Sequence, residues 1–328
     1  MNSTRNQHFI SQVEQRLNAC NTNAAPSNQR IFEFQILDRE ARILQLNDRN
    51  GRLIEKNLSM LDLFSFDMDK DKNLRANFEE LFGQYERKVG IDTATILRAH
   101  AEHRSDIFPV LFDLFVAKLI NFIRNPFTVV KAINTFGKFA EHHPTNAAIY
   151  ESYVRTIIGR RPQQAHICGE LGISDEHYKT WLRLLFMLLT PMADGQENFL
   201  EQSMRSLFQQ DDDAIFVHVH KYNDQFCLLS DRGFSSPIEQ GAHMAFDFNL
   251  SARAFIRFAF LNYEAVLGRP VPEGILRGLQ SGPKVIQVSY LTDDLPALDV
   301  FHRRVVEQSH KSVYCAGTDI YSAQVLGL

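Results

Sequence analysis

The residues best suited to chemistry gather in one stretch of the sequence, from Asp211 to Phe258. They are two histidines, a serine, an aspartate and an arginine: His218, His220, Ser230, Asp231 and Arg232. Imidazole and carboxylate groups transfer protons or hold metal ions, and a guanidinium holds phosphate or carboxylate groups. This stretch is therefore the first place to look for a catalytic or binding site.

Three strands with turns between them are expected to position these side chains. In the first strand, 215–219, apolar residues alternate with others, so His218 and the following His220 lie on one face, about 7 Å apart. Residues 225–229 are expected to return as the second strand of a hairpin, and 246–250 to form the third. Ser230 and Asp231 then follow a strand end, where side chains are held by the sheet yet open to solvent.

Two readings of the histidine pair remain open. His218 and His220, with Asp231 beyond the turn, would suit a metal site of two histidines and one carboxylate. The alternative is the solvated face of an edge hairpin, since no third ligand is fixed by the spacing. The sequence leaves any metal or other cofactor unknown.

Arg98 and His103 form a second candidate. Their Arg-x4-His spacing resembles that of the helical ribonucleases of the higher-eukaryote-and-prokaryote nucleotide-binding class, although Ala99 replaces a usually polar residue. The resemblance implies that the arginine would hold a phosphate and the histidine would transfer a proton. The alternative is a charged helix face in contact with solvent.

Residues 165–185 resemble a helix-turn-helix, with Gly172 at the turn. A helix that reads DNA presents polar and basic side chains, whereas here the second helix begins with Asp175 and becomes apolar over 182–186. A core helix is therefore favoured over a DNA-reading helix. Near the end of an earlier apolar helix, Arg124 would either clamp an anion or cap the helix carbonyls.

Composition restricts the possible partners and the compartment. The 328 residues carry a formal net charge of -4, so binding to nucleic acid would require a local basic patch. Four separated cysteines without a CxxC pair fit a reducing cytoplasm, and the polar N-terminus lacks the apolar core of a signal peptide. The longest apolar run, 107–123, is interrupted by Asp113, Lys118 and Asn121, which predicts a buried helix in a soluble protein.

The pattern as a whole predicts an α+β fold. A mixed or antiparallel sheet is expected from N-terminal and C-terminal strands, with a large helical region between them. Segments 1–70, 71–210 and 211–328 would hold the first hairpin, the helices and a C-terminal α+β part that shares one sheet with the first segment. The expected strands are 31–36, 42–46, 215–219, 225–229, 246–250 and 285–290. The expected helices are 72–90, 93–103, 106–123, 128–141, 145–158, 163–171, 175–189, 196–209, 252–267 and 295–314.

Several short motifs along the chain recur in one known family. They are the opening Gln7-His8-Phe9-Ile10-Ser11-Gln12, then Arg124-Asn125-Pro126, Leu229-Ser230-Asp231-Arg232, Phe248-Asn249-Leu250-Ser251 and the segment 298–314. Together they resemble the bacterial family called domain of unknown function 4238. Ser11 and Gly233 stand where that family usually has proline, and Asp299 where asparagine is commoner.

The resemblance implies a role in antiviral defence, because some members of that family accompany mobile elements and phage-defence genes. Transferred residue by residue, it gives one candidate site: His8, Gln12, Arg124, Ser230 and Asp231. In a nuclease or other phosphodiester hydrolase, Asp231 would be the base or a metal ligand, His8 an acid or base, and Arg124 the phosphate clamp. The alternatives are a non-catalytic sensor that binds a phage protein or nucleic acid, and the Arg-x4-His ribonuclease toxin. No membrane partner is expected.

Overall fold

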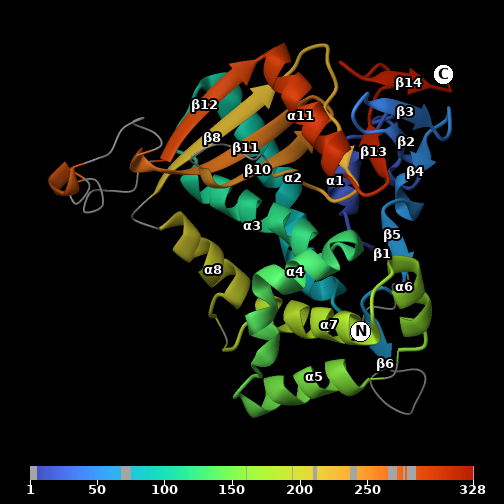
Figure 1. Ribbon diagram of the computed structural model, residues 1–328, viewed down its shortest axis with the longest axis vertical. Coiled ribbons are helices and arrows are strands. Elements are labelled where there is room, and N and C mark those ends of the chain that lie inside the picture. Colours follow the sequence, from blue (N-terminus) through green and yellow to red (C-terminus); the bar gives the residue numbers. More distant parts are fainter. Residues whose placement is uncertain are drawn as a thin grey trace.

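Four long strands from the last third of the chain form one mixed sheet in the order β10-β11-β8-β12 (Figure 1). The strands are β8 (Asp213–Lys221), β10 (Ala242–Ser251), β11 (Ala254–Asn262) and β12 (Ile286–Thr292). β10, β11 and β8 pair antiparallel, and β12 pairs parallel to β8. The alternation predicted for β8 is present, because Ile215, Val217 and Val219 are all fully buried.

The ends of the chain meet in a second sheet, so the predicted pairing of N-terminal with C-terminal strands is present, but β8, β10 and β12, which were expected in the same sheet, form the separate four-stranded sheet. Its order is β14-β3-β2-β13-β9, and β4 also pairs with β2. The strands are β2 (Arg30–Asp38), β3 (Ile43–Leu46), β4 (Arg52–Leu53), β9 (Leu229–Ser230), β13 (Ser312–Cys315) and β14 (Gln324–Leu326). In this computed structural model, the residues described are 6–67, 75–159, 161–193, 195–209, 213–236, 242–264, 272–275, 278 and 286–327.

Helix α11 (Leu295–Gln308) joins the two sheets through a shared apolar cluster. The ring of Phe301 stacks on Phe255 of β11, with 4.2 Å between the ring centroids. Other residues of the same cluster, such as Phe34 and Val313, come from β2 and β13. β11 is therefore connected to the N-terminal hairpin by side-chain packing through α11, whereas β13 is connected to it by backbone pairing with β2.

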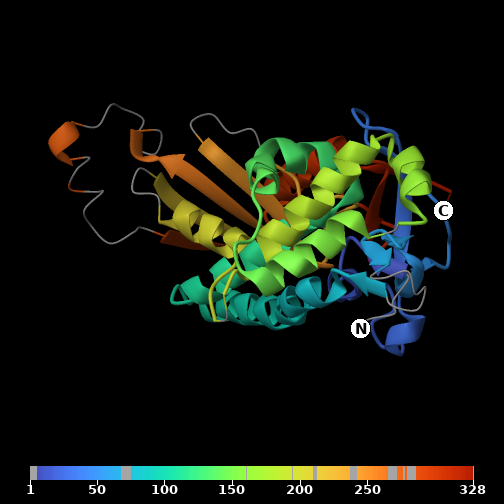
Figure 2. The same ribbon diagram turned by 90° about the horizontal axis from the view of Figure 1, so that it is seen from below.

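The central helices gather on one side of the four-stranded sheet (Figures 1 and 2). They are α2 (Glu79–Glu102), α3 (Phe108–Arg124), α4 (Val129–Phe136), α5 (Ala147–Ile158), α6 (Gln164–Leu171), α7 (Asp175–Leu189) and α8 (Phe199–Phe208). Phe115 of α3 makes edge-on contacts with several rings of the sheet, including Phe248 and Phe258. The observed fold is α+β, as predicted. Among the described residues, no helix combines the length and apolarity needed to cross a membrane.

The N-terminal region adds short elements beside the second sheet. β1 (Asn6–His8) pairs with β5 (Ser59–Leu61), and β6 (Ser65–Asp67) pairs with β7 (Arg75–Asn77). Helix α1 (Gln12–Arg16) begins at Ser11, whose hydroxyl accepts a hydrogen bond from the backbone N–H of Glu14. This helix contacts β2 on one side and α2 on the other. Val13 packs closely against α2, since a Cβ atom added at Gly90 would lie 3.4 Å from its side chain.

Five predicted elements were wrong. Residues 254–262 form strand β11 rather than part of a helix; its residues are apolar on both faces except for Arg257 and Asn262, so no alternation marks it as a strand. The predicted helix 295–314 ends at Gln308, and β13 follows it. The two helices predicted over 72–90 and 93–103 are one helix, α2, that begins at Glu79 and continues through Gly90; residues 75–77 form β7, and 72–74 lie outside the described residues. Residues 225–228 form no strand beside β8; β9 pairs with β13 instead.

Candidate functional site

Three segments that resemble one family meet in space: the chain after β1, the end of α3 and the end of β9. The guanidinium Nε of Arg124 donates to the carbonyl of Phe9 at 3.1 Å. Asn125 donates through Nδ2 to the carbonyl of Asp231 at 2.8 Å. The segments around Phe9 and Asp231 thus both lie against the C-terminal end of α3.

The carboxylate of Asp231 is occupied by backbone. Oδ1 accepts the N–H of His310 at 2.7 Å, and Oδ2 accepts those of Lys311 and Ser312 at 2.7 and 3.0 Å. The side chain is buried, and burial raises its pKa above the ordinary value, while the three N–H groups oppose that rise. Asp231 therefore fixes the loop between α11 and β13 against the end of β9.

Ser230 has a similar local role. Its hydroxyl lies 2.8 Å from the hydroxyl of Ser309, and it accepts the backbone N–H of Arg232 at 3.0 Å. Ser230 is also buried. The serine and the following aspartate thus hold two neighbouring segments, and both set the position of Arg232 and His310.

Arg124 joins elements within the core. Nη1 donates to the carboxylate of Glu86 at 2.5 Å, and Nη2 donates to Oδ1 of Asn121 at 3.1 Å. The guanidinium carbon lies 5.0 Å from the centre of the Phe82 ring. With the bond from Nε to Phe9, every nitrogen of the guanidinium has a partner, and the side chain is 2% exposed. A substrate phosphate would have to displace these contacts.

His8 and Gln12 lie apart from Asp231 in their contacts. His8 Nε2 is 3.3 Å from the carbonyl oxygen of Ile54, and burial lowers the pKa of the imidazole. Gln12 accepts a hydrogen bond from Arg16 within α1, at 2.5 Å between Oε1 and Nη2. In the described part of the chain, no hydrogen bond joins either side chain to Asp231.

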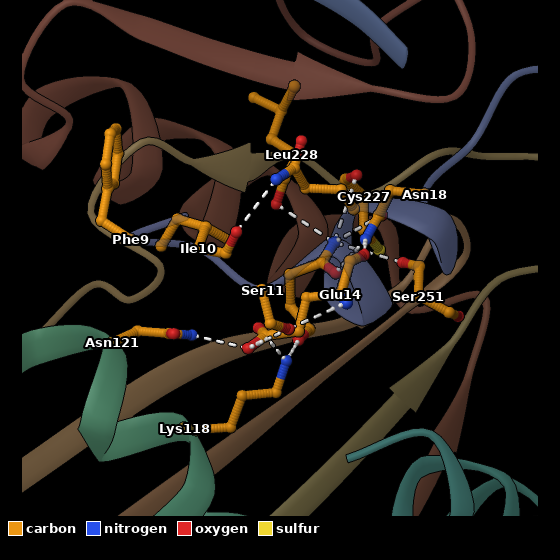
Figure 3. Close-up of polar contacts among 12 residues, drawn as sticks. Phe9, Ile10, Ser11, Glu14, Asn18, Lys118, Asn121, Cys227, Leu228 and Ser251 are labelled. Carbon is orange, nitrogen blue, oxygen red and sulfur yellow. Dashed lines mark hydrogen bonds and ion pairs between the residues drawn. The ribbon is translucent and has the colours of Figure 1, made fainter. Parts of the chain in front are cut away.

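A buried polar network adjoins Arg124, and the sequence interpretation missed it. Lys118 Nζ lies 2.6 Å from the carboxylate of Glu14 and donates to the carbonyl of Asn249 at 2.7 Å (Figure 3). Asn121 donates to the other oxygen of Glu14, also at 2.7 Å. Lys118, Asn121 and Arg124 follow one another at intervals of three along α3, which places them near one face. That spacing inside an apolar run was the available signal.

An open pocket of about 450 Å³ lies beside the locked aspartate. Three basic side chains border it, and Glu170 is the single acidic residue among the described lining. The lining residues are Pro126, Phe127, Thr128, Val129, Val130, Lys131, Asn134, Glu170, Leu171, Gly172, Ile173, Arg232 and His310. The pocket therefore has a local cationic character although the chain carries net negative charge.

The basic side chains of this pocket form no direct ion pair among the described residues, although the charge of the buried Asp231 lies close enough to attract Arg232 and His310. Within the described ranges, Lys131, Arg232 and His310 have no ion-pair partner, and Nε of Arg232 is buried without a hydrogen bond. The His310 ring stacks on Phe127 at 4.2 Å between centroids, and burial lowers its pKa. The pocket wall also includes the first turn of α4, where backbone N–H groups carry partial positive charge. This arrangement can hold an anion.

The histidine pair on β8 does not reach Asp231 through any contact among the described residues. His220 is 3% exposed and stacks on Phe255 at 4.3 Å, and neither of its ring nitrogens has a partner in the part of the chain described. Burial lowers its pKa to about 4. Nor do the described residues contain a group of three or more histidine, cysteine, aspartate or glutamate side chains placed to hold a metal ion.

The two helical motifs have different outcomes. Arg98 lies within α2, whereas His103 is the left-handed C-cap residue after it, and both are exposed. Five positions on a helix correspond to about 140° of rotation, so the two side chains leave on different faces. Residues 164–189 do form a helix-turn-helix, but α7 is a core helix, as favoured: Trp181 is fully buried and donates to the carbonyl of Ile123.

Comparison with known proteins finds no matching family model, no similar curated protein and no similar solved structure. The resemblance to the domain of unknown function 4238 family stays a prediction. The geometry of its pockets and polar groups is therefore the basis for a functional proposal.

Proposed function

We propose that this chain recognises a phosphate group of its ligand in the pocket of Lys131, Arg232 and His310, and that it does so in antiviral defence. The observation that carries the proposal is the convergence of Lys131, Arg232 and His310 on one pocket, where none of them forms a direct ion pair among the described residues. An anion bound between them would accept hydrogen bonds from Lys131 and Arg232 and from the imidazole N–H of His310.

The physical argument rests on desolvation. The guanidinium of Arg232 is partly buried, and burial lowers its pKa, so the fold keeps a charged group in poor contact with water. A phosphate oxygen would restore hydrogen bonds to this planar group, which binds phosphate well. The first turn of α4 adds its favourable dipole end to the same pocket.

Recognition is favoured over hydrolysis for a chemical reason. Hydrolysis of a phosphodiester requires an acid or base that reaches the substrate, whereas Asp231 accepts three backbone N–H groups and Arg124 has a partner at every nitrogen. His310 is the one imidazole in the described lining of the pocket. A hydrolase built on this pocket would therefore depend on His310.

The test uses purified full-length protein with two probes, inorganic phosphate and a fluorescent single-stranded oligonucleotide with a 5′-phosphate. Arg232→Gln and Lys131→Gln should each weaken binding about tenfold, since each removes a charged contact worth about 1.4 kcal/mol. Lys138→Gln is the matched control, because Lys138 is exposed in the segment after α4 and borders a different pocket. Equal binding by all three variants and the unchanged chain would overturn the proposal.

The two probes separate a free phosphate from a nucleic acid. If the pocket serves nucleic acid, the oligonucleotide should bind much more tightly than inorganic phosphate, with a binding constant that falls with salt. Cleavage of the oligonucleotide that disappears in His310→Gln would replace recognition by hydrolysis. In cells challenged with phage, Arg232→Gln should lose protection while Lys138→Gln keeps it.

A further inference from the structure

A second cavity, of about 300 Å³, lies between α3, α4, α8 and β10. Its lining is mainly aromatic and aliphatic: Phe115, Leu119, Phe122, Lys131, Thr135, Phe136, Met204, Leu207, Phe234, Ser236, Met244 and Phe246. Among the described residues, the lining is apolar apart from one lysine and two hydroxyl groups. A mainly apolar concavity with a few polar groups at its border is the usual form of a small-molecule site.

Lys131 connects this cavity to the cationic pocket, because its side chain lines both. Its Nζ lies 5.9 Å from the centre of the Phe122 ring and 5.8 Å from that of Phe234. Lys131 is exposed and has no carboxylate partner among the described residues. Apolar surface and unpaired positive charge therefore adjoin one another at this residue.

We infer that the ligand is a small amphipathic phosphate, whose apolar body fills the phenylalanine-lined cavity while Lys131 and Arg232 hold its phosphate. This inference rests on the proposed function and specifies its ligand class. The cavity lies at the lower end of the range of ligand pockets, about 300–1,000 Å³, so the body is one ring system or a chain of moderate length.

The body is apolar rather than a nucleobase because the cavity offers few hydrogen bonds. The hydroxyl of Thr135 already donates to the carbonyl of Lys131 at 2.9 Å, and that of Ser236 donates to Ala245 at 3.1 Å. A base would place its own polar edge against the remaining rings and leave donors and acceptors unpaired. A nucleobase would therefore give up several hydrogen bonds to water on binding, whereas an alkyl or aryl group makes no such hydrogen bonds.

Three probes test the two halves of the ligand separately: decyl phosphate, decanol and inorganic phosphate. Each is titrated by calorimetry into the purified full-length protein, after circular dichroism has shown that each variant is folded. Decyl phosphate should bind at least tenfold more tightly than either partial probe. Lys131→Met should reduce the affinity for decyl phosphate about tenfold and leave that for decanol unchanged, while Lys138→Met changes neither.

A variant that fills the cavity completes the test. Thr135 is exposed on α4, so Thr135→Trp can add bulk at the cavity without disturbing the core. It should abolish the gain of decyl phosphate over inorganic phosphate and leave phosphate binding itself unchanged; Thr145→Trp, at an exposed position before α5, is the control. Phosphate binding that depends on Arg232, with no gain from the decyl chain, would overturn the inference alone. If the unchanged chain does not bind inorganic phosphate, or binds it equally well in Arg232→Gln, the proposed function is overturned as well.

Discussion

Lys118→Met is predicted to destabilise the chain by about 3–5 kcal/mol, the usual cost of removing one partner of a buried ion pair. In the intact chain the side chains of Lys118 and Glu14 are 1% and 2% exposed, and their charged atoms lie 2.6 Å apart. The variant leaves the Glu14 carboxylate buried with Asn121 and the hydroxyl of Ser11 as its remaining side-chain partners. It also leaves the carbonyl of Asn249 without the ammonium donor.

The predicted loss of stability follows from the burial of the ion pair rather than from its short distance. A second lysine, Lys88, distinguishes the effect of burial from that of distance. Lys88 and Asp113 are also close, at 3.0 Å, but their side chains are 57% and 43% exposed. Water and salt screen such a pair, so Lys88→Met should cost less than about 1 kcal/mol. The double variant Glu14→Gln with Lys118→Met removes both buried charges and should lose less stability than Lys118→Met alone.

Unfolding in urea provides the assay, because the chain has one tryptophan and Trp181 is fully buried. Its fluorescence should report the loss of the α3–α7 contact, where Trp181 donates to the carbonyl of Ile123. The unfolding midpoints of Lys118→Met, Lys88→Met and the double variant are compared with that of the unchanged chain. If Lys118→Met and Lys88→Met lose the same small amount, the reasoning that makes this ion pair an anchor of the core is wrong.

Three further predictions concern the glycine after β9 and two histidines. Gly233→Ala should destabilise the chain by about 1–3 kcal/mol in urea unfolding, because φ is +79° and a Cβ would lie 2.8 Å from that of Asn121. His220→Phe should raise the unfolding free energy at pH 7 by roughly 1 kcal/mol, since it removes unpaired ring nitrogens. The pKa of His220 is lowered to about 4, so the intact chain should lose stability as pH falls from about 6.5 toward 4, and the variant should lose less. The phosphate affinity of the unchanged chain should rise relative to that of His310→Gln as pH falls below the ordinary histidine value of 6.5, because His310, whose pKa is lowered by burial, gains charge there; the comparison cancels the protonation of the phosphate itself.

Strands with one face in the core and the other face less buried could be predicted from the sequence, because apolar and polar residues alternate along them. β8 alternates between buried and less buried residues, and the hairpin of β2 and β3 shows the same pattern. β11 could not be recognised, because a strand between two others with both faces covered has no alternation to detect. β13 was also missed, because its four residues continue the apolar pattern of α11 and become a strand only through pairing with β2 and β9.

The candidate site could be located from the sequence but its roles could not be assigned. Ser230 and Asp231 do lie at a strand end, as predicted, but both side chains are buried rather than open to solvent; the segment after β1 does approach the end of α3. What Asp231 does is decided by the N–H groups of 310–312, about 80 residues further along the chain. A carboxylate at a strand end has the same local sequence whether it faces a substrate or a loop.

This distinction changes how the simplest experiment should be interpreted. Asp231→Ala would remove the acceptor of three backbone N–H groups, of which that of Ser312 is buried and would cost about 1–3 kcal/mol, and would release the loop that carries His310. Loss of activity in that variant would follow from the loss of loop structure and would not identify a catalytic base. Arg232→Gln alters the neighbouring side chain that borders the pocket and keeps the loop anchored. If Arg232→Gln keeps the urea midpoint of the unchanged chain but no longer binds phosphate, Arg232 is a binding residue. Ser230 and Asp231 beside it then have a structural role.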